Sequence, residues 1–186
     1  MYNEWVKNNC PVPAPHIVKQ KIIQSYQNLT GINILVETGT YLGDMFEAQK
    51  NHITSLYSIE LGQELYEKAC LRFENERAIH LFQGYSGKVM PQIMVELKES
   101  AIFWLDGHYS AGITAKGDKE CPIFEELDAI LNKASNFSHV LLIDDARCFI
   151  GQGDYPTIEA LSEFVLAKDP RYKLEVKHDV IRFTID

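Results

Sequence analysis

The sequence lacks most of the features that would mark a secreted, metal-clipped or membrane protein. Its four cysteines form no CxxC pair, which argues against a zinc knuckle or a thioredoxin-type motif. No apolar run approaches the roughly 20 residues that a membrane-spanning helix needs. Residues 1–15 lack the basic start and apolar run of a secretory signal. Scattered thiols without such a signal predict a reduced, cytoplasmic protein that does not associate with a membrane.

The sequence also has no excess of positive charge. Lys and Arg number 18 against 26 Asp and Glu, which gives a formal net charge of −8. Nucleic-acid-binding proteins usually carry a basic stripe, and none is visible here. We therefore expect a small-molecule or glycan substrate and no nucleic-acid partner. The sequence leaves the oligomeric state open, a homodimer included.

What the sequence does contain is a regular alternation of strand-length apolar runs and helical patterns. At 186 residues without a repeat, low-complexity tract or visible boundary, a single domain over 1–186 is expected. The alternation predicts an α/β fold, a doubly wound parallel sheet with helices on both faces. Two short segments at the C-terminus alternate and predict a terminal β-hairpin. The predicted strands cover 32–37, 55–60, 78–83, 101–106, 139–144, 172–177 and 180–185; the predicted helices cover 15–28 and 86–97 and begin near 42, 61, 122 and 158.

Polar residues stand where the five apolar strands end. In open α/β sheets, ligands bind beyond the carboxyl ends of the strands. Polar ends beside apolar strand bodies therefore predict a site at this edge. The residues at these ends are Glu37, Glu60, Gln83 with Gly84, Asp106, and Asp144 with Asp145.

The turn after the first strand reads Glu-Thr-Gly-Thr-Tyr-Leu-Gly-Asp over 37–44. Gly39 can take a positive φ and let a ligand approach the backbone, and Gly43 would let the helix start pack closely on the strand. The turn lacks the third glycine of a dinucleotide fingerprint. A carboxylate at Glu37 would repel a pyrophosphate but suits a cationic sulfonium amino acid. The alternative is a tight strand–helix turn without a ligand.

Glu60 ends the second strand. A carboxylate at this place can accept hydrogen bonds from both ribose hydroxyls of a nucleoside. The alternative is a solvated glutamate that caps the following helix.

Four segments together resemble the class I S-adenosylmethionine (SAM)-dependent methyltransferases: Val36–Tyr41, Ser58–Leu61, Gly84–Ser86 and Leu105–His108. The resemblance runs from about Ile32 to the C-terminus. It implies a Rossmann-like, seven-stranded sheet that is mostly parallel and ends in an antiparallel strand, in agreement with the hairpin. It also implies SAM as cofactor. The cofactor contacts that it implies are Glu37, Thr38, Gly39, Thr40, Tyr41, Gly43 and Asp44 at the methionine end, Glu60 at the ribose, Gly84, Tyr85 and Ser86 near the adenine, and Asp106.

Tyr85 is a departure from this pattern, because many members of the family carry an acidic residue just after the glycine of the third strand. The side chain of Tyr85 could stack on the adenine or pack in the core.

In the sheet order of that family, the fourth and fifth strands are neighbours, so Asp106, His108, Asp144 and Asp145 would converge. Like charges held together need a cation or a shared proton, and oxygen ligands suit Mg²⁺. The arrangement resembles the metal-dependent, macrocin-type sugar O-methyltransferases, although His108 replaces their second acid. This implies a metal site at Asp106, Asp144 and Asp145, with Asp106 or His108 as the base. Alternatively, Asp144 and Asp145 cap loop backbone and His108 is an ordinary loop histidine.

We therefore predict a SAM-dependent methyltransferase that O-methylates a small molecule, a sugar or glycan precursor, with assistance from Mg²⁺. Residues 1–30 are expected to line the acceptor side, and the polar loop 109–121 to act as a lid. Two alternatives stay open: a non-catalytic SAM-binding protein, and a metal-dependent hydrolase that uses Asp106, His108, Asp144 and Asp145. The missing glycine fingerprint argues against an NAD-dependent oxidoreductase. No motif identifies the acceptor.

Overall fold

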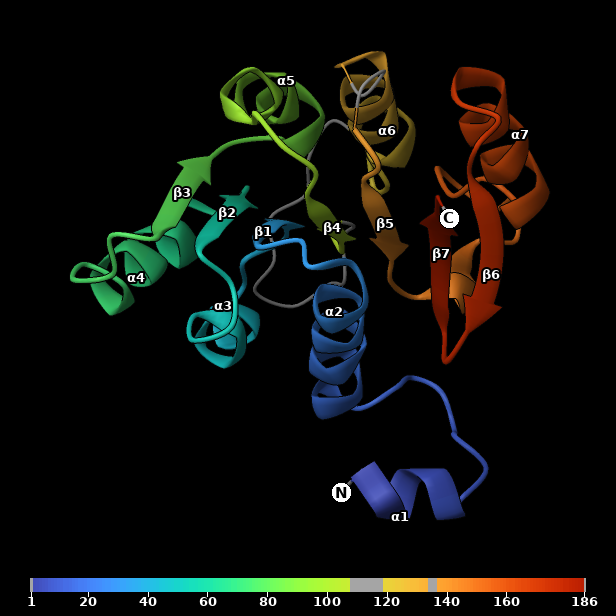
Figure 1. Ribbon diagram of the computed structural model, residues 1–186, viewed down its shortest axis with the longest axis horizontal. Coiled ribbons are helices and arrows are strands. Elements are labelled where there is room, and N and C mark those ends of the chain that lie inside the picture. Colours follow the sequence, from blue (N-terminus) through green and yellow to red (C-terminus); the bar gives the residue numbers. More distant parts are fainter. Residues whose placement is uncertain (1, 108–118, 134–136, 186) are drawn as a thin grey trace.

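A computed structural model describes residues 2–107, 119–133 and 137–185. It has three layers, with a central β-sheet covered by helices on both faces (Figure 1). Helices α5, α6 and α7 lie on one face, and α2, α3 and α4 lie on the other. The strands are Ile34–Thr38 (β1), Ser55–Glu60 (β2), Ile79–Gln83 (β3), Ile102–Leu105 (β4), Val140–Ile143 (β5), Lys173–Lys177 (β6) and Val180–Thr184 (β7). The helices are Tyr2–Lys7 (α1), His16–Thr30 (α2), Asp44–Gln49 (α3), Gln63–Arg72 (α4), Ser86–Glu96 (α5), Ile123–Lys133 (α6) and Ile158–Lys168 (α7), and Ala146–Cys148 forms a short 3-10 turn (η1).

The sheet has seven strands in the order β3-β2-β1-β4-β5-β7-β6. Strands β1 to β5 are parallel, whereas β7 is antiparallel to β5 and to β6. The predicted fold class, a mostly parallel doubly wound sheet that ends in an antiparallel hairpin, is confirmed.

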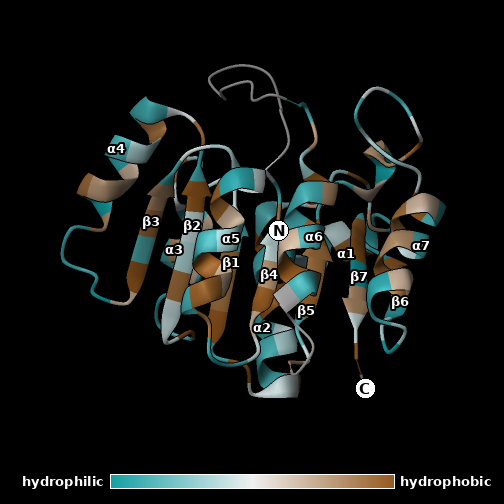
Figure 2. Ribbon diagram, turned by 90° about the horizontal axis from the view of Figure 1, so that it is seen from above, coloured by the Kyte–Doolittle hydropathy of each residue, from teal (hydrophilic) through white to brown (hydrophobic). Residues whose placement is uncertain are grey.

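The central strands are apolar because both of their faces are covered. Every residue of β1, β4 and β5 is buried, whereas every residue of the edge strand β6 is exposed. Successive side chains of a strand point to opposite faces. Phe103 of β4 therefore packs with one core cluster and Trp104 with the other. Figure 2 shows hydrophobic colour along the central strands and mixed colour on the helices, as amphipathic helices require.

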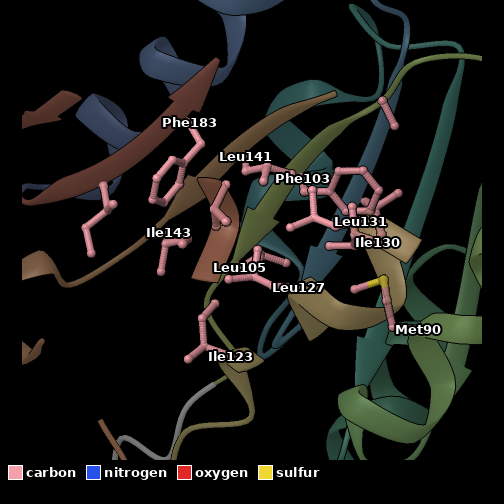
Figure 3. Close-up of a cluster of buried hydrophobic side chains, with 14 of the residues drawn as sticks. Met90, Phe103, Leu105, Ile123, Leu127, Ile130, Leu131, Leu141, Ile143 and Phe183 are labelled. Carbon is pink, nitrogen blue, oxygen red and sulfur yellow. The ribbon is translucent and has the colours of Figure 1, made fainter. Parts of the chain in front are cut away.

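The larger core lies between the sheet and helices α5, α6 and α7. Figure 3 shows Phe103 and Leu141 from neighbouring strands pointing toward side chains of α5 and α6, among them Met90 and Leu127. These four residues are fully buried. This packing holds the strands in register and thereby fixes where their carboxyl ends meet.

The register brings the five parallel strands to one common edge. Thr38 pairs with Ile59 and with Leu105, and Leu105 pairs with Ile143. Glu60 lies opposite Gln83. The polar residues that follow these strands are consequently neighbours along one side of the sheet.

The N-terminal segment differs from the prediction, which assigned no helix before residue 15. Residues Tyr2–Lys7 form α1, and Trp5 is buried with its indole N–H donating to the carbonyl oxygen of Pro11 over 2.7 Å. All four cysteines, each within the described residues, are free thiols. In the described part of the chain, no helix has both the length and the apolar character that crossing a membrane demands.

Candidate functional site

The turn between β1 and α3 depends on Gly39. Its φ is +84°, and a Cβ placed there would lie 2.6 Å from the backbone oxygen of Asp106. Its own N–H donates to the carbonyl oxygen of Ile59 over 2.9 Å. The expected positive φ is confirmed. The group that approaches Gly39 is the backbone after β4. Gly39, which follows β1, is therefore in contact with the ends of both β2 and β4.

Gly43 also has a positive φ, +80°, directly before α3. A Cβ at this position would lie 2.7 Å from the ring of Phe73, which follows α4. The close contact of Gly43 is therefore with the end of a neighbouring helix, whereas its role in packing the helix start on the strand stays a prediction. Asp44 turns outward and pairs with Arg72 at 2.7 Å.

Glu37 is a buried carboxylate at the end of β1. The Ser58 hydroxyl donates to its Oε2 over 3.1 Å, and Ser58 in turn lies 2.6 Å from the Thr40 hydroxyl. Burial raises the pKa of Glu37 well above its usual range, and the negative charges of Asp106 and Glu60 raise it further, against the Ser58 hydrogen bond. Asp106 and Glu60 therefore both lie within electrostatic reach of Glu37. Such a group of charges attracts a cation.

Glu60 is buried at the end of β2 and is held by two backbone donors. The N–H of Tyr41 donates to its Oε2 and the N–H of Gly62 to its Oε1, each over 2.8 Å. The alternative of a solvated residue does not hold, although the bond to Gly62 does support the start of α4. A carboxylate has about four acceptor positions. Two further hydrogen bonds, such as those from a diol, are compatible with this geometry.

The end of β3 lies beside Glu60. The N–H of Gly84 donates to the backbone oxygen of Glu60 over 2.9 Å. Tyr85 is extended and precedes α5, whose first residue, Ser86, is buried. The ammonium of Lys88 lies 5.7 Å from the centre of the Tyr85 ring. The structure thus brings residues 84–86 next to the carboxylate of β2.

Thr38 and Asp106 connect the ends of β1 and β4. The N–H of Asp106 donates to the Thr38 hydroxyl over 3.1 Å, and Asp106 itself is half-buried. A Cβ at Gly107 would lie 3.0 Å from Oε1 of Glu126, a buried acid in the first turn of α6. His108 and residues 109–118 of the predicted lid lie outside the described residues.

The acids after β5 already have basic partners. Lys19 of α2 donates a hydrogen bond to Oδ2 of the fully buried Asp144, and its ammonium lies 3.9 Å from Asp145. Arg147 pairs with Asp145 at 2.7 Å and also with Asp179. The N–H of Asp145 donates to Asp144 over 2.8 Å, so part of the backbone-capping alternative holds.

The Mg²⁺ site predicted at Asp106, Asp144 and Asp145 is not supported. Within residues 2–107, 119–133 and 137–185, no three His, Cys, Asp or Glu side chains are grouped so that they could hold a metal ion. The reason is that the carboxylates that would bind the metal already have cationic partners. Lys19 and Arg147 provide the positive charge that the metal was expected to bring.

Sequence reasoning missed five residues at this edge: Lys19, Ser58, Glu126, Arg147 and Asp179. Two of them had a signal: Lys19, because residues 1–30 were expected to reach the acceptor side, and Ser58, because it begins the segment Ser58–Leu61 that carries the family resemblance. The others lie in helices, strands or turns without a motif, and their roles depend on tertiary contacts.

A cavity of about 620 Å³ lies among α5, α6 and α7 and begins at Gly87, directly after the predicted residues 84–86. Its lining includes Pro91, Phe124 and Phe164, and the ion pair of Lys119 with Glu125 lies at its rim. Of the predicted site residues that the structure describes, none lines it.

Comparisons with known proteins give the same fold. No family model and no curated protein matches the sequence. Among solved structures, the O-methyltransferase TomG from Streptomyces achromogenes in complex with SAM has a TM-score of 0.64 at 15% identity, covering 98% of this chain and 86% of that chain. The N-methyltransferase NodS from Bradyrhizobium japonicum with S-adenosylhomocysteine (SAH) has a TM-score of 0.57 at 13% identity, covering 90% and 85%.

The 23S rRNA methyltransferase ErmE has a TM-score of 0.54 at 13% identity, covering 89% of this chain and 68% of that chain. The chain therefore has the Rossmann-like fold of the class I SAM-dependent methyltransferases.

Proposed function

We propose that this protein is a SAM-dependent methyltransferase that acts on a hydroxyl group of a small molecule, a sugar or glycan precursor. One observation carries the proposal: the buried carboxylates Glu37 and Glu60 flank the Gly39 turn at the carboxyl edge of the sheet. TomG and NodS, which share the fold, are methyltransferases solved with SAM and with SAH. The macrocin-type resemblance is a hypothesis that rests on the sequence alone.

Glu37 would face the cationic methionine end of SAM. Burial beside two other acids makes ionisation of Glu37 unfavourable when the site is empty, and a bound cationic group would offset that unfavourable energy. Thr38, Thr40, Tyr41 and Gly43 belong to the same turn and would complete this end. Of these, Thr40 and Tyr41 are tied to the acids through Ser58 and Glu60. Asp44, also predicted as a contact, is exposed and pairs with Arg72, so it would have to turn inward to reach the cofactor.

Glu60 would accept the ribose hydroxyls through the lone pairs that its two backbone donors leave open. Gly84, Tyr85 and Ser86 lie beside Glu60 and would flank the adenine. The flat ring of Tyr85 suits stacking on a base, which addresses the absence of an acid at that position.

Bound SAM would supply an electrophilic methyl group: the acceptor oxygen bonds to the methyl carbon while the carbon–sulfur bond breaks and leaves its electron pair on sulfur. Asp106 would take the acceptor proton, because it follows β4 and touches the Gly39 turn through its backbone. His108 is the second candidate base from the sequence.

The acceptor side would be formed by residues 1–30, since Lys19 near the start of α2 pairs with Asp144 at the end of β5 and interacts electrostatically with Asp106 after β4. Acids and bases side by side suit a polyhydroxy acceptor, because they can accept and donate hydrogen bonds. The neighbours methylate different acceptors, among them 23S rRNA in the case of ErmE. The absence of a nucleic-acid partner, the homodimer and the cytoplasmic location stay predictions from the sequence.

Two alternatives compete with this function. A non-catalytic SAM-binding protein would use the same cofactor residues and differ only in transfer. A hydrolase that uses Asp106, His108, Asp144 and Asp145 would need metal at those acids, and the Lys19–Asp144 pair argues against it.

Isothermal titration with SAH in metal-free buffer containing EDTA tests the proposal. We expect saturable binding by the wild type and a loss of about 1.5–3 kcal/mol for Glu60→Ala, because a charged acceptor is removed. Glu64→Ala is the matched control, because Glu64 is 83% exposed and pairs with Lys68 at 2.7 Å. Thermal melts of both variants check that they fold. Wild-type protein that binds no SAH at high micromolar concentration would exclude the proposed function.

A further inference from the structure

We propose that the ammonium group of Lys19 is the resident cation of the acceptor site and performs there the role of a divalent metal, so that methyl transfer proceeds without one. This inference rests on the proposed function. It concerns a residue that no motif identified, on a helix distant in sequence from the acids that it contacts.

Packing fixes the position of Lys19. It lies in the first turns of α2, and the neighbouring residues Val18, Ile22 and Ile23 are buried in the core on that face of the sheet. The Lys19 side chain is only 16% exposed, and its ammonium binds Asp144, which is fully buried. A buried carboxylate needs a charge partner, and removing that partner leaves an unpaired buried charge. The pair is therefore a built-in part of this edge.

The charges around Lys19 are those that were expected to bind a metal. Asp144 accepts its hydrogen bond, Asp145 lies 3.9 Å away, and Asp106 acts on it electrostatically. His16, one turn earlier on α2, is a further titratable group near it. Burial disfavours the charge of Lys19, but the negative charges of Asp144 and Asp106 outweigh that effect and raise its pKa.

A divalent cation does not fit beside this ammonium. It would need oxygen atoms of Asp144 and Asp145, and these already face Lys19 and Arg147. Two cations on the same carboxylates repel each other, so a metal would have to displace the lysine. Arg147 has a further partner in Asp179, which secures it in place.

The ammonium has the chemistry to act on an acceptor oxygen. It has three donor hydrogens, and the hydrogen bond that it makes within the described residues goes to Asp144. A donor that remains can bind the acceptor oxygen and stabilise the negative charge that develops there. In the transfer, the acceptor oxygen gains the methyl group, SAH leaves with the electron pair of the broken bond, and the proton goes to Asp106. Lys19 stays protonated throughout.

Binding of Mn²⁺, followed by electron paramagnetic resonance, tests the inference without any acceptor. For the wild type we expect no saturable binding up to millimolar Mn²⁺. Lys19→Met removes the charge and keeps most of the length of the side chain, so the freed acids should bind Mn²⁺ at least tenfold more tightly. Lys19→Arg keeps the charge and should behave as the wild type. Lys21→Met, on an exposed position of the same helix, is the matched control and should change nothing.

Wild-type protein that binds Mn²⁺ tightly would overturn the inference, because the metal would then displace Lys19. Equal Mn²⁺ affinity of the wild type and a folded Lys19→Met variant would overturn it as well. Lys19→Gln provides a second neutral variant if Lys19→Met does not fold. An SAH titration on the same samples separates the two hypotheses: SAH binding together with tight Mn²⁺ binding refutes the role of Lys19 alone, whereas absent SAH binding refutes the proposed function.

Discussion

Replacing Glu37 by glutamine should stabilise the empty protein and weaken cofactor binding at the same time. The carboxylate is buried beside Asp106 and Glu60, so its ionisation is costly. Glutamine removes the charge but keeps an oxygen that can accept the Ser58 hydrogen bond. Substitutions that relieve a functional site of such a cost commonly add about 0.5–2 kcal/mol to the free energy of unfolding.

The pH dependence of that gain follows from the direction of the pKa shift. The pKa of Glu37 is raised in the folded state, so the unfolded chain loses this proton at lower pH than the folded protein does. The wild type therefore loses stability as pH rises above the unfolded value of 4.5 and through the folded pKa. The stabilisation by Glu37→Gln should be absent below the unfolded value and complete above the folded one. In a chain of this length, 1 kcal/mol corresponds to about 2–4 °C in Tm.

The same substitution should reduce affinity for SAH, whose ammonium group Glu37 would face. A hydrogen bond to a charged partner contributes about 1.5–3 kcal/mol, which corresponds to roughly a 10- to 150-fold rise in Kd. Thermal melts at pH 4 and pH 8, with calorimetric titration of SAH at pH 8, measure both effects. Glu64→Gln is the control and should change stability by less than about 0.5 kcal/mol. A destabilised Glu37→Gln variant with unchanged SAH affinity would show that Glu37 is merely structural, and would refute this reasoning.

Three further predictions follow from single residues. Gly39→Ala should lower the free energy of unfolding in urea more than Gly31→Ala does. Both glycines have a positive φ, but only at Gly39 would the added Cβ lie 2.6 Å from a backbone oxygen. Equal losses would show that this close approach is unimportant. Burial lowers the pKa of His139 from the unfolded value of 6.5 to about 4. About 3 kcal/mol of the free energy of unfolding, fully present above pH 6.5, should therefore be lost as pH falls toward 4. A His139→Gln variant that loses as much stability over this pH range would contradict the prediction. Leu127→Ala should cost about 2–5 kcal/mol by the same urea assay, since Leu127 is fully buried in the core of Figure 3, and a loss below 1 kcal/mol would contradict that packing.

The strands could be predicted because their physical signal is local. Strands β4 and β5 are covered on both faces and therefore read as short apolar runs. The carboxyl ends of parallel strands share one edge, so the sequence alone was enough to place Glu37, Glu60 and Asp106 near one another. Helix starts were predicted to within two residues as well. The helix expected from residue 42 begins at Asp44, because Gly43 with its positive φ lies directly before it.

The partners of the acids could not be predicted, because they come from distant parts of the chain. Asp144 and Lys19 lie far apart in the sequence, and no spacing rule connects them. Sequence reasoning correctly recognised that clustered acids need positive charge, and it assigned that charge to a metal. Helix α1 was missed for a related reason. It is short, and its one buried residue, Trp5, stabilises it only through tertiary packing.

A crystal structure with SAH bound tests the central claim most directly, because it shows which groups hold the ribose and the ammonium. We predict both ribose hydroxyls within about 2.5–3.0 Å of the Glu60 carboxylate, with the ammonium group beside Glu37. SAH found elsewhere, such as in the cavity among α5, α6 and α7, or bound with Glu37 and Glu60 turned away from it, would contradict the central claim.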